Sequence, residues 1–89
     1  MGKIEKQVTI LNEDGLHARP AGVLVKKASE FQSKIEIRSD QGVVKNAKSI
    51  MGLMSMGLEK GAVVTLIAEG VDAAGAIDAL SSLIRHQLH

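Results

Sequence analysis

The run Ala62-Val63-Val64-Thr65-Leu66-Ile67-Ala68 sets the architecture of this chain of 89 residues. A short, apolar and β-branched stretch of this kind is typical of a strand at the centre of a sheet. A helix is expected to follow it, from about Asp72 to Leu88, because apolar residues recur there at helical spacing. The apolar residues of that helix are Ala73, Ala76, Ile77, Leu80, Leu83 and Ile84.

The N-terminal half predicts a strand, a helix and a hairpin. Residues 3–11 alternate between apolar and polar side chains, as a half-buried strand does. The interval from Ala18 to about Ser29 has apolar residues at helical spacing and predicts a helix. Residues 34–38 alternate again, and the turn Asp40-Gln41-Gly42 leads into a short strand from Val43 to Lys45. The apolar positions of these elements are Ile4, Val8, Ile10, Ala21, Leu24, Val25, Ala28, Ile35 and Ile37.

A short helix is expected between Ser49 and Gly57. Ser49 is a favourable N-cap, because its hydroxyl can accept a hydrogen bond from a free amide, and a glycine such as Gly57 commonly ends a helix. The elements then follow the order βαββαβα within a single domain that spans residues 1–89. Helices segregated from a sheet that contains a hairpin indicate an α+β layer fold, with one face of the sheet covered and the other open to solvent.

Composition excludes several classes of protein. Eleven basic and ten acidic residues nearly cancel, and Phe31 is the one aromatic residue, which argues against binding of nucleic acid. The absence of cysteine excludes disulfides and thiolate metal sites, and suits the cytoplasm. We expect no signal peptide and no membrane span, because no segment has the required apolar core. His86 and His89 can stabilise a helix end, so no metal site and no cofactor are expected.

The segment Gly15-Leu16-His17-Ala18-Arg19-Pro20 is the first candidate site. Gly15 supplies a turn and Pro20 lies in a first helical turn, so His17 falls at the junction of loop and helix. Unpaired amides and the positive end of the helix dipole favour an anion there, phosphate in particular. An imidazole is also nucleophilic near neutral pH, which indicates a site that carries a phosphoryl group. The alternative is a surface histidine that stands at a helix start without a function.

The segment Ser49-Ile50-Met51-Gly52-Leu53-Met54 is the second candidate site. Its large apolar side chains either complete the core or form an exposed patch near His17, where flexible methionines suit docking to several partners. Ser49 is either an N-cap alone or also a phosphorylation site. Phosphate at that position would leave the helix intact and impair docking through its charge.

Together the two segments resemble the histidine-containing phosphocarrier protein HPr of the bacterial sugar phosphotransferase system. Residues 15–21 match the active-site motif of that family, and residues 48–55 match its regulatory-serine motif in the form typical of Gram-positive bacteria. The resemblance covers essentially the whole chain and implies an open-faced β-sandwich, with a four-stranded antiparallel sheet covered on one face by helices. Gly22 is a mild departure, because threonine or alanine is common there.

The resemblance implies a phosphoryl relay. His17 would accept a phosphoryl group at Nδ1 from enzyme I and pass it to sugar-specific IIA proteins or domains, while Arg19 pairs with the group. Ser49 would be phosphorylated by HPr kinase/phosphorylase in carbon catabolite repression, together with a catabolite control protein. The expected protein is a monomeric carrier, not an enzyme. The residues expected to contact its partners are Ala18, Pro20, Ile50, Met51 and Met54.

Two alternatives stay open at this stage. A phosphocarrier of a regulatory branch, such as the nitrogen-related phosphotransferase system or the dihydroxyacetone kinase relay, would use the same histidine without feeding sugar import. The Ile50-Met51-Gly52 form of the serine motif argues against this branch. A small α+β module would instead bind an anion through His17 and Arg19 and would not become phosphorylated.

Overall fold

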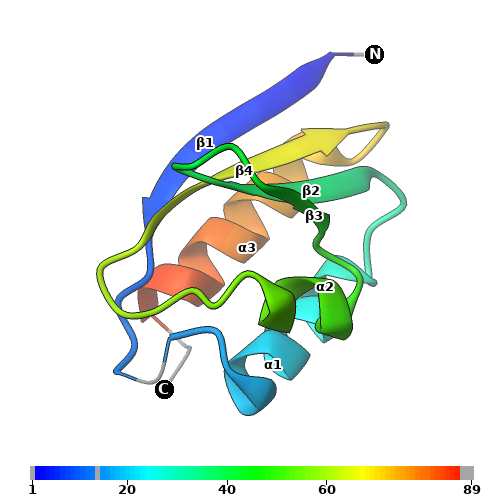
Figure 1. Cartoon of the computed structure of the whole chain (residues 1–89). Helices are drawn as coiled ribbons and strands as arrows, with labels where there is room; N and C mark the ends of the chain where they lie inside the picture. The colour runs from blue at the N-terminus through cyan, green and yellow to red at the C-terminus, as the bar shows by residue number, and fades with distance from the viewer. Residues whose placement is uncertain (1, 14, 87–89) are drawn as a thin grey trace.

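The computed structural model describes residues 2–13 and 15–86 (Figure 1). Its elements follow the predicted order, βαββαβα. They are β1 (Lys3–Thr9), α1 (Ala18–Ala28), β2 (Lys34–Ser39), β3 (Val44–Asn46), α2 (Ile50–Ser55), β4 (Val63–Glu69) and α3 (Ala73–His86).

The four strands form one antiparallel sheet in the order β1-β4-β2-β3. β4 lies between β1 and β2, with Val64 opposite Val8 on one side and Leu66 opposite Ile37 on the other. These four side chains are buried. The prediction that residues 62–68 form a central strand is therefore confirmed, apart from a shift of one residue at each end.

The helices lie over one face of this sheet (Figure 1), so the expected open-faced β-sandwich is confirmed. In α3 all six predicted apolar residues are buried. In α1 the predicted apolar residues Ala21, Leu24 and Ala28 are also buried, and Val25 is half-buried against the core. Side chains from both layers fill the core, and the largest of them that are fully buried are Ile10, Leu16, Leu24, Ile35, Ile37, Leu53, Leu66, Leu80 and Ile84.

Several boundaries differ from the prediction. β1 ends at Thr9 instead of residue 11, although the Ile10 amide still donates to the Ala62 carbonyl at 2.8 Å. β3 runs from Val44 to Asn46 instead of from Val43 to Lys45. The Val43 carbonyl accepts from the Ser39 amide (2.8 Å) and closes the hairpin. The predicted turn residue Asp14, the continuation of the last helix to Leu88, and His89 lie outside the described residues.

A carboxylate at the start of α3 joins that helix to the segment before β2. Asp72 accepts hydrogen bonds from the backbone amides of Gln32 (2.8 Å) and Ser33 (2.9 Å) and from the Ser33 hydroxyl. These bonds, above all the one from the hydroxyl, lower the pKa of the Asp72 carboxyl from its ordinary value. Gly70 packs so closely on Ser33 that a side chain at position 70 would collide with it. The Asp72 contact thus joins the start of α3 to the segment between α1 and β2.

Candidate functional site

His17 is the N-cap of α1, and its side chain is exposed. Its backbone is extended (φ −82°, ψ −168°), and its carbonyl accepts the first helical hydrogen bond from the Ala21 amide at 2.8 Å. The imidazole makes no capping hydrogen bond to α1. His17 therefore lies at the predicted junction of loop and helix, with its ring presented to solvent.

The first turn of α1 offers features that favour an anion beside this ring. The amides of a first turn have no intrahelical acceptor, so those of Ala18 and Arg19 can donate outward. Both residues are exposed, and the first turn carries no acidic residue. Within residues 2–13 and 15–86, Arg19 forms no ion pair, so its guanidinium is free to bind a phosphate.

The loop before His17 is fastened to the loop between α2 and β4. The Leu16 amide donates to the Leu58 carbonyl at 2.9 Å, and the Leu16 side chain is buried. Gly15 has a φ of 61°, and a Cβ at this position would collide with the Leu58 carbonyl oxygen, so only glycine fits. Lys60 and Glu13 join the same two loops through an ion pair of 2.6 Å. His17 thus follows a segment that tertiary contacts hold.

Ser49 is the N-cap of α2, as predicted. Its Oγ accepts a hydrogen bond from the Gly52 amide at 3.0 Å, and its carbonyl accepts from the Leu53 amide at 3.0 Å. The residue is half-buried, so part of it faces solvent. Gly57 follows the C-cap residue Met56 with a φ of 61°, and it ends the helix as expected.

The side chains of α2 divide between the core and the surface. Leu53 is fully buried, which places this member of the segment in the core. Ile50, Met51 and Met54 are 40%, 78% and 44% exposed. We term these three residues the apolar docking patch, after the role predicted for them. α2 packs beside α1 (Figure 1), and the Cδ1 atom of Ile50 lies close to the point that a Cβ atom at Gly22 would occupy. The patch therefore adjoins the helix that starts at His17.

Two residues of α1 were also expected to contact partners. Ala18 is exposed beside His17, which suits that role. Pro20 is buried, so its predicted place in an exposed partner surface needs correction. The reason is helical spacing, because Pro20 precedes the buried residues Leu24 and Ala28 by four and eight positions and shares their face.

Asn12 and Leu58 are the contacts of the site that sequence reasoning missed. Asn12 was interpreted only as a turn residue, yet its side chain is buried and donates to the Gly15 carbonyl. A polar residue beside a glycine turn gives a weak signal for such a contact. No local pattern could have identified Leu58, because its role depends on a backbone carbonyl 42 positions further along the chain than Leu16.

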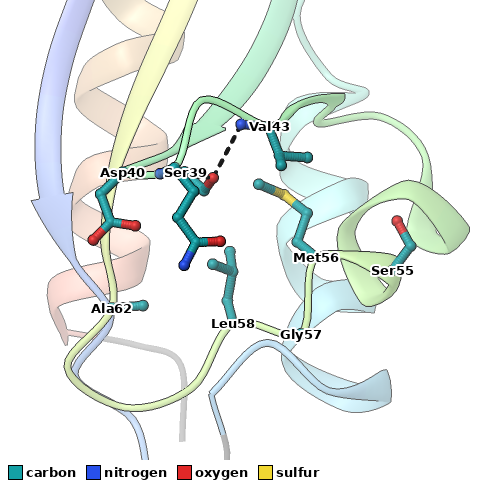
Figure 2. A pocket seen from close by; sticks show the side chains of 9 residues that line it. Ser39, Asp40, Val43, Ser55, Met56, Gly57, Leu58 and Ala62 are labelled. Atoms are coloured by element: carbon teal, nitrogen blue, oxygen red, sulfur yellow. Dashed lines mark hydrogen bonds between the residues drawn. The ribbon is translucent and has the colours of Figure 1, made fainter.

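A pocket of about 270 Å³ lies between the β2–β3 turn and the end of α2 (Figure 2). Figure 2 shows Ser39 and Asp40 at its turn side, and Met56 and Leu58 on the opposite side. The Ser39 hydroxyl accepts from the Val43 amide at 3.1 Å, so this polar group stabilises the β2–β3 turn. The lining contains neither His17 nor Arg19, so the candidate site is a separate, exposed surface.

Across residues 2–13 and 15–86, no helix combines the length and apolar character needed to cross a membrane. In the same described part of the chain, no three or more His, Cys, Asp or Glu side chains gather in a way that could hold a metal ion.

The fold and the site define a class of small open-faced β-sandwich with an exposed histidine at the start of its first helix. A family model described as "PTS HPr component phosphorylation site" matches residues 4–86. The chain belongs to this family, HPr, and is therefore a protein of the phosphocarrier type.

Individual relatives agree with this assignment. The chain is 46% identical to the HPr-like protein Crh of Halalkalibacterium halodurans, over 94% of this chain and 99% of the relative. Its structure resembles that of the phosphocarrier protein HPr from Bacillus anthracis, with a TM-score of 0.90, 39% identity and coverage of 94% and 99% of the two chains. An HPr from Thermoanaerobacter tengcongensis gives a TM-score of 0.88 and 50% identity, with coverage of 92% and 91%.

Some relatives are dimers. The structure of Crh from Bacillus subtilis is described as a swapped dimer, and an HPr from Thermoanaerobacter tengcongensis is also described as a dimer. The expectation that the present chain is a monomer gains no support from these two relatives and stays a prediction.

Proposed function

We propose that this protein accepts a phosphoryl group on His17 from phosphorylated enzyme I and passes it to sugar-specific IIA proteins or domains. The observation that carries the proposal is the exposed imidazole at the N-cap of α1, beside outward-facing amides and Arg19. A simple anion-binding module would need no nucleophile at this position, whereas a carrier needs one.

In the proposed reaction an unprotonated ring nitrogen of His17, Nδ1 by analogy with the family, attacks the phosphorus atom of the donor. The bond between phosphorus and the donor breaks, and the leaving group takes its electron pair. Phosphoryl transfer depends mainly on positioning and on stabilisation of charge. The first-turn amides and the Arg19 guanidinium would stabilise the phosphoryl oxygens, and the same contacts would assist the onward transfer to a IIA protein.

The exposure of the site supports a carrier in place of an enzyme. His17, Ala18 and Arg19 are all exposed, so two different partners can approach the same histidine in turn. The apolar docking patch on α2 would supply the contact area that both partners share. In this proposal the protein is a covalent intermediate of a cytoplasmic relay.

A regulatory role for Ser49 forms the second half of the proposal. HPr kinase/phosphorylase would phosphorylate its hydroxyl, and the product would act with a catabolite control protein. Phosphate at a helix N-terminus is favourable for the helix, so α2 should persist. The added charge would lie directly before Ile50 and Met51, where it would oppose docking of enzyme I.

Incubation with enzyme I and labelled phosphoenolpyruvate tests the first half of this proposal. We expect a label that is lost in acid, is stable in alkali, and is absent from His17→Ala. Ser49→Ala is the matched control and should take up label at His17 as the wild-type protein does. Failure of the wild-type protein to take up any label would exclude the carrier function.

A second candidate function follows from the 46% identity to Crh, since the related protein of Bacillus subtilis is described as a catabolite repression protein. In that case the chain would act through Ser49 alone. Labelling by HPr kinase and ATP, without labelling by enzyme I, would favour this regulatory function. Transfer from His17 to a IIA protein of the nitrogen-related branch, and to none that serves sugars, would favour the regulatory-branch carrier.

A further inference from the structure

Asn12 is a buried polar residue near His17 that the proposed phosphoryl transfer leaves without a role. The residue is 6% exposed and lies in the loop between β1 and α1. Its side-chain Nδ2 atom donates to the Gly15 carbonyl, and its main-chain carbonyl accepts from the Gly15 amide at 3.1 Å. Asn12 therefore binds both polar backbone groups of the glycine that begins the active-site motif.

These hydrogen bonds fix the peptide group between Gly15 and Leu16. Its carbonyl oxygen accepts from Asn12, and its N–H donates to the Leu58 carbonyl at 2.9 Å. The buried Leu16 side chain adds a third anchor. Because His17 follows this peptide directly, its backbone direction depends on the contact with Asn12.

The second polar atom of the Asn12 side chain has no partner within residues 2–13 and 15–86. Its Oδ1 atom is buried and has no hydrogen-bond partner among the residues that the structure describes. Buried polar groups are nearly always paired, and an unpaired one disfavours folding. A leucine of similar size would remove this unpaired oxygen, and it would also leave the Gly15 carbonyl without its donor from position 12. A residue that burdens the fold while holding the loop beside a reactive group is typical of a functional position.

We propose that Asn12 is a positioning residue for phosphoryl transfer. By holding the Gly15–Leu16 peptide, it sets the direction from which the His17 imidazole and the first-turn amides of α1 meet the phosphoryl group. This inference rests on the proposed carrier function and adds a residue to it.

The test compares Asn12→Leu with Ser33→Ala as acceptors for enzyme I. Asn12→Leu should fold, and it should lower kcat roughly tenfold or more while KM stays unchanged, because the apolar docking patch is untouched. Ser33→Ala is the matched control. It removes the hydrogen bond from the buried Ser33 to the half-buried Asp72, beyond the opposite end of α1 from His17, and it should keep the wild-type kcat. Asn12→Asp serves as a second variant, because an ionised carboxylate cannot donate to the Gly15 carbonyl.

A folded Asn12→Leu or Asn12→Asp variant with a kcat within about twofold of wild type would overturn the proposal. Backbone amide spectra separate this failure from failure of the carrier function itself. In Asn12→Leu the NMR signals of Leu16 and His17 should shift, and those near Ser33 should not. If the wild-type protein accepts no phosphoryl group, the carrier function is excluded and the positioning role falls with it. If the wild-type protein is phosphorylated and the Leu16 and His17 signals do not move in Asn12→Leu, the positioning role alone is overturned.

Discussion

The Cδ1 atom of Ile50 lies 3.6 Å from the point that a Cβ atom at Gly22 would occupy. The first residue of α2 therefore meets α1 where α1 has no side chain, and a methyl group would fit there in ordinary van der Waals contact. Gly22 is half-buried in the helix.

Gly22→Ala should stabilise the protein by about 0.5–1 kcal/mol, because alanine loses less backbone entropy in a helix and the added methyl group packs against Ile50. Gly57→Ala is the matched control, since the same change at a φ of 61° is strained and should destabilise. Chemical denaturation of the two variants measures both effects. A loss of stability in Gly22→Ala would show that α1 and α2 pack more tightly than described.

Ser49→Ala should destabilise the protein by about 1 kcal/mol, because it removes the hydroxyl that accepts from the Gly52 amide. Ser49→Asp should keep the stability, since aspartate is an equally good N-cap. It should nevertheless raise the KM for enzyme I through its charge beside the apolar docking patch. Chemical denaturation of both variants measures the effect on the helix cap, and phosphoryl-transfer kinetics measure the effect on docking. A wild-type KM in Ser49→Asp would contradict the proposed effect of charge at this position.

Met51→Asp should weaken docking without unfolding the protein. Met51 is 78% exposed, so the free energy of unfolding should change by no more than about 0.5 kcal/mol. The charge should raise the KM for enzyme I, while kcat at saturation is preserved because His17 is unaffected. Val71→Asp is a suitable control, because Val71 is similarly exposed but lies in the segment between β4 and α3. Equal KM values for the two variants would remove the apolar docking patch from the proposal.

Asp72 should make stability depend on acid pH. Its folded-state pKa is lowered by hydrogen bonds from Ser33 and Gln32, so it stabilises the fold above its unfolded pKa of about 3.8. That contribution is lost as the pH falls through the lower folded pKa. Asp72→Asn should therefore be less stable than wild type at neutral pH, and the difference should shrink in acid. Thermal unfolding from about pH 6 to pH 2 tests this, with Asp78→Asn, on the exposed side of α3, as the control.

The oligomeric state is a further prediction. The open face of the sheet carries charged side chains, among them Arg38 and Glu5, which pair at 3.4 Å across β4. Charged side chains of this kind oppose association of sheets. Sedimentation should give a mass near 9.4 kDa. A mass near twice that value would contradict the prediction and would place this chain with its dimeric relatives.

Local pattern predicted most of this fold, and tertiary contacts account for the rest. Strand alternation around Ile35 and Ile37, and the helical stripe of α3, required only the periodicity of apolar residues. Pro20 was misplaced because its role as a helix-start residue concealed its position on the buried face. The hydrogen bonds of Asp72 to Ser33, and of Leu16 to Leu58, join residues about 40 positions apart, and no local pattern identifies such pairs.

The candidate site shows the same difference between local pattern and tertiary contacts. The places of His17 and Ser49 at helix starts could be predicted from short motifs, because turn and cap residues leave a local signature there. Asn12 left no comparable signature. Its importance depends on which atoms of Gly15 it meets, and that is a property of the folded loop.

The acceptor that fastens the His17 loop is the main-chain oxygen of Leu58, and every amino acid carries that atom. Substitution at position 58 can therefore alter the core and still leave the anchor in place. Position 15, which packs against this oxygen, does not tolerate such substitution, because any side chain at Gly15 would collide with it. The two sides of this contact therefore differ in their tolerance to mutation. A library randomised at both positions should recover several apolar residues at 58, which lies in the core, and glycine alone at 15.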